Sequence, residues 1–170
     1  MPMTRSQLYV AGIATPDGEF TATYSERGLC RLEFPAAGKP NRGAREAELP
    51  SLVKAWHELT SDSVRNILAA RPPTLLPPLD LSSGTDFQKR VWRFLRQIAC
   101  GQTRSYGEVA AAIERPRAFR AVGAACGANP IPLLIPCHRV LAANQRLGGF
   151  SGGLEWKRLL LSRERSWPNG

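Results

Sequence analysis

Residues 105–130 read SYGEVAAAIERPRAFRAVGAACGANP, and this stretch decides the fold of the second half of the chain. Ser105 is followed three positions later by Glu108, which is the capping-box pattern that starts a helix. The segment ERPR interrupts the helical pattern, and a second helical run at about 117–127 ends at Asn129, before a proline. Two short helices joined by a tight turn predict a helix-turn-helix.

The second helix of this motif carries small side chains on most of its faces. These small residues are Ala118, Ala121, Gly123, Ala124 and Ala125. A small-sided helix can approach a large neighbour closely, and that neighbour is either another helix or a DNA groove. Arg117 and Arg120 favour DNA, although an arginine alone is also an ordinary solvated helix residue.

The segments on either side of this motif extend the helical half. Residues 85–98, TDFQKRVWRFLRQI, begin with a second capping box and predict an amphipathic helix of about four turns that stops at Gly101. After the motif, 131–135 form a short buried strand or extended run, 144–153 a glycine-rich loop and 154–164 a closing helix. The leucines of the closing helix that are available for the core are Leu154, Leu159, Leu160 and Leu161.

The first half of the chain has the pattern of a β-sheet followed by helix. Residues 6–34 alternate apolar and polar side chains and predict a β-meander with a turn at 16–18. A loop is expected at 35–47 and one or two short helices at 50–70. The proline-rich segment 71–84 is excluded from helix and predicts a connector between two halves.

Charge supports a division of the chain at this connector. Residues 1–80 hold 9 Lys or Arg and 9 Asp or Glu, whereas residues 81–170 hold 14 and 5, so the net charge of +9 lies entirely in the second half. An Arg-rich basic half suits phosphate contact, and a merely soluble basic surface is the alternative. We expect an α+β protein in which 1–80 form an α/β structural domain and 81–170 a mostly helical domain with the helix-turn-helix.

Composition is that of a soluble globular protein. The 170 residues are 43% hydrophobic and 22% charged, no apolar run is long enough to span a bilayer, and the N-terminus lacks the pattern of a signal peptide. Four cysteines and two histidines, His57 and His138, occur without the paired spacings of a structural zinc site. We therefore expect no bound metal. We also expect a cytoplasmic location, at the nucleoid when the protein is on DNA. His57 is expected at the surface of a helix.

One cysteine has a histidine directly after it. Residues 135–140 read IPCHRV, which places Cys137 and His138 side by side in an apolar segment. The pair is either a reactive thiol with its base or a buried cysteine beside a surface histidine. A histidine base needs an orienting carboxylate, and Glu164 at the end of the closing helix is the candidate. The cysteines expected to be inert are Cys30, Cys100 and Cys126.

The segment NPIPLLIPCHRV at 129–140 resembles the active-site segment of the O6-alkylguanine-DNA alkyltransferases, also called methylated-DNA–protein-cysteine methyltransferases. The resemblance covers residues 85–164, where TDFQKRVW, SYGEVA, RAVGAACGANP and GGFSGGLEWKRLLL follow the family's order and spacing. The first half is less diagnostic, although the hairpin around TPDGEF is similar to the family's N-terminal sheet. The resemblance implies a ribonuclease-H-like N-terminal domain and a winged-helix-like C-terminal domain.

The resemblance also implies a repair reaction on duplex DNA. Members of the family move the alkyl group of O6-alkylguanine irreversibly to their own cysteine, so each molecule acts once and needs no cofactor. Cys137 would be the acceptor, because a soft thiolate suits attack on an alkyl carbon. His138 would take the thiol proton through a bridging water, Glu164 would orient His138, and Asn129 would brace the turn around the site.

The lesion lies inside the duplex, so the base must be flipped out to reach the thiol. In the family the helix-turn-helix enters the minor groove. Arg120 matches the arginine that fills the vacated place, and Tyr106 matches the tyrosine that helps rotate the nucleotide and donates a proton to N3 of guanine. The other residues implied on the DNA face are Arg117, Ala121 and Gly123.

The implied substrate pocket combines the turn after the cysteine with the glycine-rich loop. Backbone carbonyls of Cys137 and Val140 would hold the guanine amino group, and Ser151 would donate a hydrogen bond to O6. Phe150 and Gly152 would complete the pocket, with Phe150 standing where some members have tyrosine, a change that bears on bulky alkyl groups. Without the motif, Ser151 would be an ordinary turn residue.

Two other functions are weighed against this one. Alkyltransferase-like proteins bind lesions without transfer but carry another residue, often tryptophan, in place of the cysteine, so Cys137 argues against that class. A Cys–His hydrolase would need an oxyanion hole and turnover. We expect a monomer that binds double-stranded DNA containing O6-alkylguanine, and possible activity on O4-alkylthymine is left open. Its affinity should fall steeply with salt.

Overall fold

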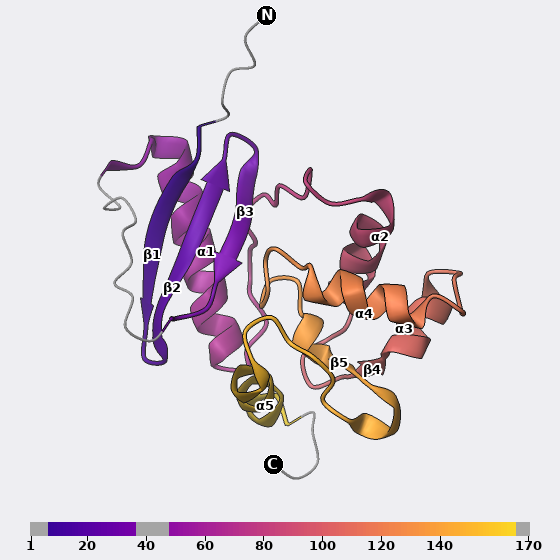
Figure 1. Ribbon diagram of the computed structural model, residues 1–170. Helices are drawn as coiled ribbons and strands as arrows, with labels where there is room; N and C mark the ends of the chain where they lie inside the picture. Colours follow the sequence, from indigo (N-terminus) through magenta and orange to yellow (C-terminus); the bar gives the residue numbers. More distant parts are fainter. Residues whose placement is uncertain (1–6, 37–47, 166–170) are drawn as a thin grey trace, which may run out of the picture.

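The computed structural model describes residues 7–36 and 48–165, and it has the α+β architecture that the sequence predicts. A small antiparallel sheet with one long helix forms the first part, and the other helices gather beside it (Figure 1). None of the helices in these described ranges is both long and apolar enough to cross a membrane. The loop predicted at 35–47 lies mostly outside the described residues, and the boundary at residue 80 stays a prediction.

The sheet has three antiparallel strands in the order β1-β2-β3, so the predicted β-meander is confirmed. Its strands are β1 (Tyr9–Thr15), β2 (Gly18–Ser25) and β3 (Gly28–Glu33). The proline-rich connector runs along β3, because the Leu29 N–H donates to the Pro78 carbonyl (2.8 Å) and the Asp80 N–H donates to the Leu29 carbonyl (2.8 Å). This segment therefore adds to the edge of the sheet as well as joining the two halves.

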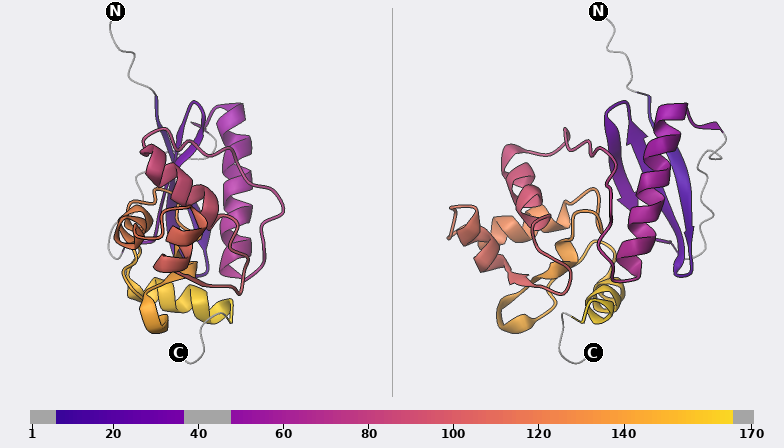
Figure 2. Two further views of the ribbon diagram at one scale, coloured as in Figure 1. Left: turned by 90° about the vertical axis from the view of Figure 1, so that its right-hand side faces the viewer. Right: turned by 180° about the vertical axis from the view of Figure 1, so that it is seen from behind.

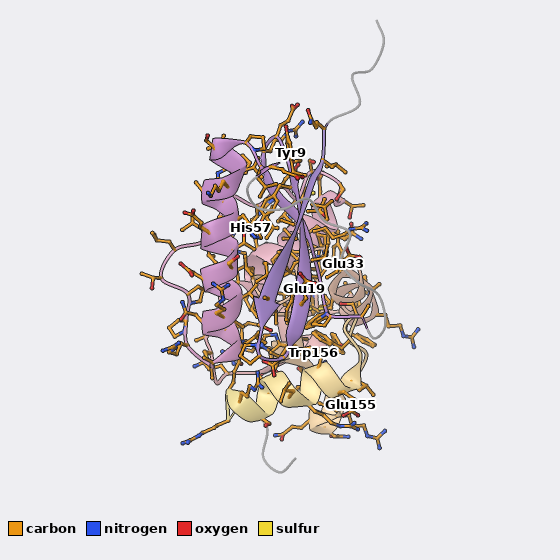
Figure 3. All side chains as sticks on the ribbon, turned by 90° about the vertical axis from the view of Figure 1, so that its left-hand side faces the viewer. Tyr9, Glu19, Glu33, His57, Glu155 and Trp156 are labelled. Atoms are coloured by element: carbon orange, nitrogen blue, oxygen red, sulfur yellow. The ribbon has the colours of Figure 1, made fainter. Side chains whose placement is uncertain are left out.

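A single helix, α1 (Ser51–Leu68), covers one face of the sheet (Figures 2 and 3). The prediction that His57 is a surface residue is wrong, since it is 3% exposed and its Nδ1 lies 2.9 Å from the Tyr24 hydroxyl. His57 follows Val53 by four positions, which places both residues on the stripe of α1 that faces the sheet. The hydroxyl of Tyr24 supplies the partner that a buried imidazole needs.

The second part of the described chain carries the predicted helix-turn-helix. Its elements are α2 (Asp86–Leu95), β4 (Arg104–Ser105), α3 (Tyr106–Ala112), α4 (Phe119–Gly127), β5 (Val140–Leu141) and α5 (Leu154–Arg163), with 3-10 turns at Cys137–Arg139 and Ala143–Gln145. Both predicted capping boxes are present, at the starts of α2 and α3. The indole N–H of Trp92 donates to the Ala125 carbonyl (2.8 Å), which fastens α2 to α4.

Helix α2 is shorter than the apolar periodicity predicts. It ends at Leu95, well before Gly101, because the Ile98 N–H closes a tight turn onto the Leu95 carbonyl (3.1 Å). The carbonyl of Ile98 is then available to Arg139, whose Nη1 donates to it at 2.6 Å. The early end of α2 thus provides a hydrogen-bond acceptor for the residue that follows the Cys–His pair.

Two further predictions for this part differ from the structure. Residues 131–135 are buried as expected but turn on themselves, with the Ile135 N–H bonded to the Ile131 carbonyl (3.0 Å) and a φ of 73° at Leu133. Leu154 is 42% exposed rather than part of the core, because it is the first residue of α5 and lies outside the face that packs inward.

Helix α5 is anchored to the sheet from both of its ends (Figure 3). Near its start, the Trp156 ring packs on Phe20, with centroids 5.4 Å apart. In its last turn, the Arg163 guanidinium donates to both carboxylate oxygens of Asp17, at 2.7 and 2.8 Å, and to the Leu68 carbonyl at 3.1 Å. Arg163 therefore joins the β1–β2 turn, the end of α1 and the end of α5.

We expect Asp17→Asn to lower the free energy of unfolding by about 1–2 kcal/mol, because it removes a bidentate, partly buried ion pair. The hydrogen bond from Arg163 holds the pKa of Asp17 below its ordinary value of 3.8. A lowered carboxyl pKa contributes stability that is present above the unfolded value and is lost as the pH falls through the folded value. The difference from wild type should therefore be complete at about pH 6 and should shrink only as the pH falls below 3.8 toward about pH 3, in urea denaturation.

The exposed carboxylate of Glu19 on β2 supplies the control for this experiment. Glu19→Gln should leave the unfolding curve almost unchanged at either pH. A difference between wild type and Asp17→Asn that stays constant with pH would contradict the ion pair as its source.

Candidate active site

Asn129 lies at the centre of the turn that presents Cys137. Its side-chain amide Nδ2 donates to the Ile135 carbonyl at 2.8 Å and to the Cys137 sulfur at 3.1 Å. Its Oδ1 accepts from the Ile131 N–H at 3.0 Å. The amide therefore holds both ends of the buried turn and also supplies a hydrogen-bond donor to the thiol.

His138, Arg139 and Glu164 form a buried ion cluster beside this turn. His138 Nε2 lies 3.0 Å from Glu164 Oε1. Arg139 donates to the same carboxylate through Nε (3.0 Å to Oε2) and Nη2 (2.8 Å to Oε1). Although burial acts to raise the pKa of Glu164, the hydrogen bonds from His138 and Arg139 lower it to about 2. Glu164 is therefore a carboxylate at neutral pH, and its negative charge is shared by two donors.

Burial sets the charge of His138, and this cluster sets its tautomer. Burial lowers the pKa of the imidazole below 6.5, which outweighs the opposing effect of Glu164, so His138 is neutral at pH 7. Since Nε2 donates its proton to Glu164, the lone pair of the neutral ring is on Nδ1. Nδ1 is buried and has no hydrogen-bond partner within the described residues. The ring therefore offers one free acceptor, which is the property of a general base.

The thiol itself is protonated at rest. Cys137 is 3% exposed, and burial raises the pKa of its thiol, against the opposing effects of the Asn129 hydrogen bond and the charge of Lys157. A buried thiol with a raised pKa is a poor nucleophile until a base removes its proton. The site thus combines an inert resting thiol, a neutral imidazole and two groups that favour the thiolate.

Lys157 is a residue that the sequence reasoning missed. Its side chain is fully buried, and Nζ donates to the carbonyls of Val140 (2.7 Å), Gly149 (3.3 Å) and Leu147. Burial lowers the pKa of this ammonium to about 8. Lysines are rarely buried, and nothing in the sequence LEWKRLLL separates this one from a surface residue. Lys157 ties α5 to both the turn after Cys137 and the glycine-rich loop.

Tyr106 opens α3 and is half-buried next to that loop. Burial raises the pKa of its hydroxyl to about 12, and the sulfurs of Cys126 and Cys137 act in the same direction. Gly148 has a φ of 67°, and a Cβ there would lie 2.8 Å from the Tyr106 hydroxyl oxygen. A glycine is therefore required at this point for the phenol to occupy its place, and the phenol keeps its proton at neutral pH.

The residues predicted to contact DNA lie on and before α4. Arg117, Arg120 and Ala121 are exposed, and Gly123 is half-buried. A Cβ at Gly123 would make ordinary contact with the Tyr106 ring at 3.9 Å. The predicted DNA face and the predicted proton donor are therefore adjacent.

The residues predicted for the substrate pocket divide between two surroundings. Val140 is buried at the start of β5, whereas Ser151 is exposed in the glycine-rich loop. The Phe150 ring packs on Phe34 of the first half, with centroids 5.5 Å apart, and a Cβ on Gly152 would lie 2.5 Å from the Phe34 ring. The sheet thus contributes to the position of the loop.

A cavity lies between the loop, the buried turn and the end of β3. Its volume is about 600 Å³. Residues that line it include Phe34, Asn129, Pro132, Ser151 and Gly152. Asn129, whose amide contacts the thiol, is therefore one of the lining residues, whereas Cys137 is not. Within the described residues, no group of three or more His, Cys, Asp or Glu side chains could hold a metal ion.

Comparison with known proteins connects this site to one family. A family model described as "6-O-methylguanine DNA methyltransferase, DNA binding domain" matches residues 86–166. The chain is 52% identical over 164 residues to a methylated-DNA–protein-cysteine methyltransferase of Methanosarcina mazei, covering 94% of this chain and 98% of the relative. The crystal structure of Mycobacterium tuberculosis OGT in complex with DNA superposes with a TM-score of 0.74 at 35% identity, over 94% of this chain and 95% of that one.

We expect Asn129→Asp to raise the pH at which Cys137 reacts with iodoacetamide. The variant keeps the oxygen that accepts from Ile131 but replaces the N–H group that donates to the sulfur and to the Ile135 carbonyl with a carboxylate oxygen, whose charge disfavours the thiolate. Carbamidomethylation rates of the Cys137 peptide, followed by mass spectrometry across a pH series, measure the shift. Cys30, which is half-buried in β3 and distant from Cys137 in the sequence, serves as the internal reference. An unshifted pH profile at Cys137 would show that the amide does not stabilise the thiolate.

Proposed function

The chain belongs to the methylated-DNA–protein-cysteine methyltransferase family, and from this membership we propose that it repairs O6-alkylguanine in duplex DNA by transferring the alkyl group irreversibly to Cys137. This is direct reversal of damage, with one transfer per molecule and no cofactor. One observation supports the assignment of Cys137 above all: its sulfur accepts from Asn129 next to His138, a neutral imidazole with a free Nδ1.

The transfer begins with removal of the thiol proton. Nδ1 of His138 takes the proton of Cys137 through a bridging water, and the resulting imidazolium is stabilised by the Glu164 carboxylate on the other side of the ring. Arg139 keeps that carboxylate ionised and in place, since it donates to both oxygens. The thiolate then has the Asn129 amide as its hydrogen-bond donor.

The bond exchange takes place at the alkyl carbon. The thiolate sulfur forms a bond to this carbon as the bond between carbon and guanine O6 breaks, and the electron pair passes into the purine. Tyr106 donates a proton to N3, so that guanine leaves in its neutral form, and the proton taken up by His138 returns to the phenolate through solvent. With a pKa of about 12 the phenol is fully protonated in the neutral range, and it gives up its proton only as negative charge develops on the purine. The thioether formed on Cys137 has no route to hydrolysis, and the protein is consumed.

The flipped guanine would be held by backbone and loop groups. The Cys137 and Val140 carbonyls accept from its amino group, and Ser151 donates to O6, while Phe150 and Gly152 close the pocket. Lys157 supports this arrangement because it donates to the Val140 carbonyl and to the loop carbonyls at the same time. The cavity beside Ser151 would receive alkyl groups larger than methyl.

DNA binding would use the basic second half. Helix α4 enters the minor groove with Arg117, Ala121 and Gly123 along the contact, and Arg120 fills the place of the extruded base. We propose a monomer whose partner is double-stranded DNA containing O6-alkylguanine, acting in the cytoplasm and at the nucleoid when bound. Cys137 stands against the lesion-sensor alternative, in which no acceptor thiol is present.

Incubation with duplex DNA that carries one O6-methylguanine should add one methyl group to each protein molecule, on the peptide with Cys137. Intact-protein and peptide mass spectrometry measure the transfer and its stoichiometry. Cys137→Ser should gain no methyl group, and Cys126→Ser, which changes the other buried thiol, should be methylated like wild type. Lesion binding without any mass change would reject the transferase assignment in favour of a lesion sensor.

The rate of transfer should be insensitive to pH down to values below 6.5. His138 acts as a neutral base, and burial lowers its pKa from 6.5, so activity is lost only as the pH falls through that lower value. Single-turnover rates measured from about pH 5 to about pH 8 test this. A decline centred at or above the ordinary histidine pKa would contradict the neutral, buried state of the base.

A further inference from the structure

Helix α4 begins with a bulky apolar side chain that the proposed mechanism does not use. Phe119 is 48% exposed in the first turn of α4. The other large apolar side chains of the described residues that are similarly exposed are Leu8, Leu52, Leu75 and Leu154. Phe119 is the aromatic member of this set, and it stands on the helix predicted to meet DNA. A single exposed apolar residue is common on protein surfaces and does not by itself indicate a binding site. The residues around Phe119 are therefore needed to assign it a role.

The surroundings of Phe119 are basic. The guanidinium carbon of Arg120 lies 5.8 Å from the centroid of the Phe119 ring, within the range of a cation–π contact. Arg115 and Arg117, just before the helix, are exposed as well. The start of α4 lies at the edge of the molecule remote from the sheet (Figures 1 and 2). A partner that covers this ring therefore has to tolerate positive charge, and the DNA backbone is such a partner.

The rest of the exposed face of α4 is smooth. After Arg120 its exposed residues are Ala121, Ala124, Gly127 and Ala128. Bulk is thus concentrated at the first turn, while the remainder of the face can approach a groove closely. The helix then leads to Asn129, whose amide contacts the Cys137 sulfur. Asn129 follows Arg120 by nine positions, of which the seven from Arg120 to Gly127 are helical and span about 10 Å.

We propose that Phe119 is an apolar wedge that enters the minor groove beside Arg120 and stacks on the base step next to the lesion. This inference rests on the proposed function, because it assigns to Phe119 a part in the base flipping that the reaction needs. Minor-groove proteins commonly unstack a base step with an apolar side chain such as phenylalanine. Two adjacent side chains, one aromatic and one cationic, would then occupy the gap and oppose return of the extruded nucleotide.

The alternative role for the ring is to hold Arg120 in place by the cation–π contact alone. Two substitutions separate these roles. Phe119→Leu keeps an apolar side chain able to wedge but removes the aromatic face, whereas Phe119→Ala removes both. A wedge predicts that leucine is much closer to wild type than alanine is. A support for Arg120 predicts that leucine and alanine are equally impaired.

The experiment measures single-turnover methyl transfer to Cys137 from O6-methylguanine in a duplex and in a single strand of the same sequence. Phe119→Ala should slow transfer from the duplex roughly tenfold, because alanine lacks the apolar bulk that holds an unstacked base step open. It should leave transfer from the single strand unchanged, because there is no helix to open. Leu52→Ala, which truncates an exposed apolar residue of α1, should match wild type on both substrates.

A second readout reports the extruded state directly. A fluorescent base analogue placed next to the lesion brightens when its stacking partner leaves, and this increase on binding should be reduced in Phe119→Ala. Equal duplex rates in wild type and Phe119→Ala would overturn the wedge, as would equal impairment of the alanine and leucine variants. Absence of transfer by wild type from either substrate would instead reject the proposed function, so the two failures are distinguishable.

Discussion

The site depends on the hydrogen bonds that the buried carboxylate of Glu164 accepts. It accepts from the imidazole of His138 and from the guanidinium of Arg139, and these two residues directly follow Cys137 in the chain. A buried carboxylate is costly unless it is paired, and here the pairing sets the tautomer of the base and the course of the backbone at the same time. Glu164 comes just after Arg163, whose ion pair with Asp17 fastens the end of α5 to the sheet. The first half of the chain therefore helps to hold the candidate site in place, although none of the proposed reacting groups belongs to it.

Much of this architecture could be predicted from the sequence because it is local. Both capping boxes, the meander and the helix-turn-helix depend on residues within a few positions of one another, and the pattern of side chains records them. The pairing of His138 with Glu164 spans 26 residues, and it was predicted on two grounds, the scarcity of carboxylates in the second half and the resemblance to a known family. Residues 81–170 contain only five Asp or Glu residues, so few other carboxylates could orient the histidine.

What the sequence could not predict depends on contacts between distant elements. His57 was predicted at the surface and Lys157 carried no signal of burial, yet both are buried. The Tyr24 hydroxyl is the partner of the histidine, and the carbonyls of Val140 in β5 and of Leu147 and Gly149 in the loop are the partners of the lysine. Helix α2 is shorter than predicted for a similar reason. Apolar periodicity continued to Ile98, but the carbonyl there bonds to Arg139 from another segment. Apolar periodicity predicts which face of a helix is buried. It does not predict which polar groups from other segments form hydrogen bonds there.

The burial of Cys137 has a consequence for a protein that is spent after one event. Oxidants and stray electrophiles attack thiolates, so an exposed, ionised cysteine would be lost to peroxide or to a metabolite before it met its target. At 3% exposure and with its pKa raised, Cys137 is shielded from such losses while the molecule waits. In the proposed reaction its activation depends on His138, which removes the thiol proton. A protonated, buried thiol reacts more slowly than an exposed thiolate. For the same reason each molecule stays active for longer before it meets a lesion.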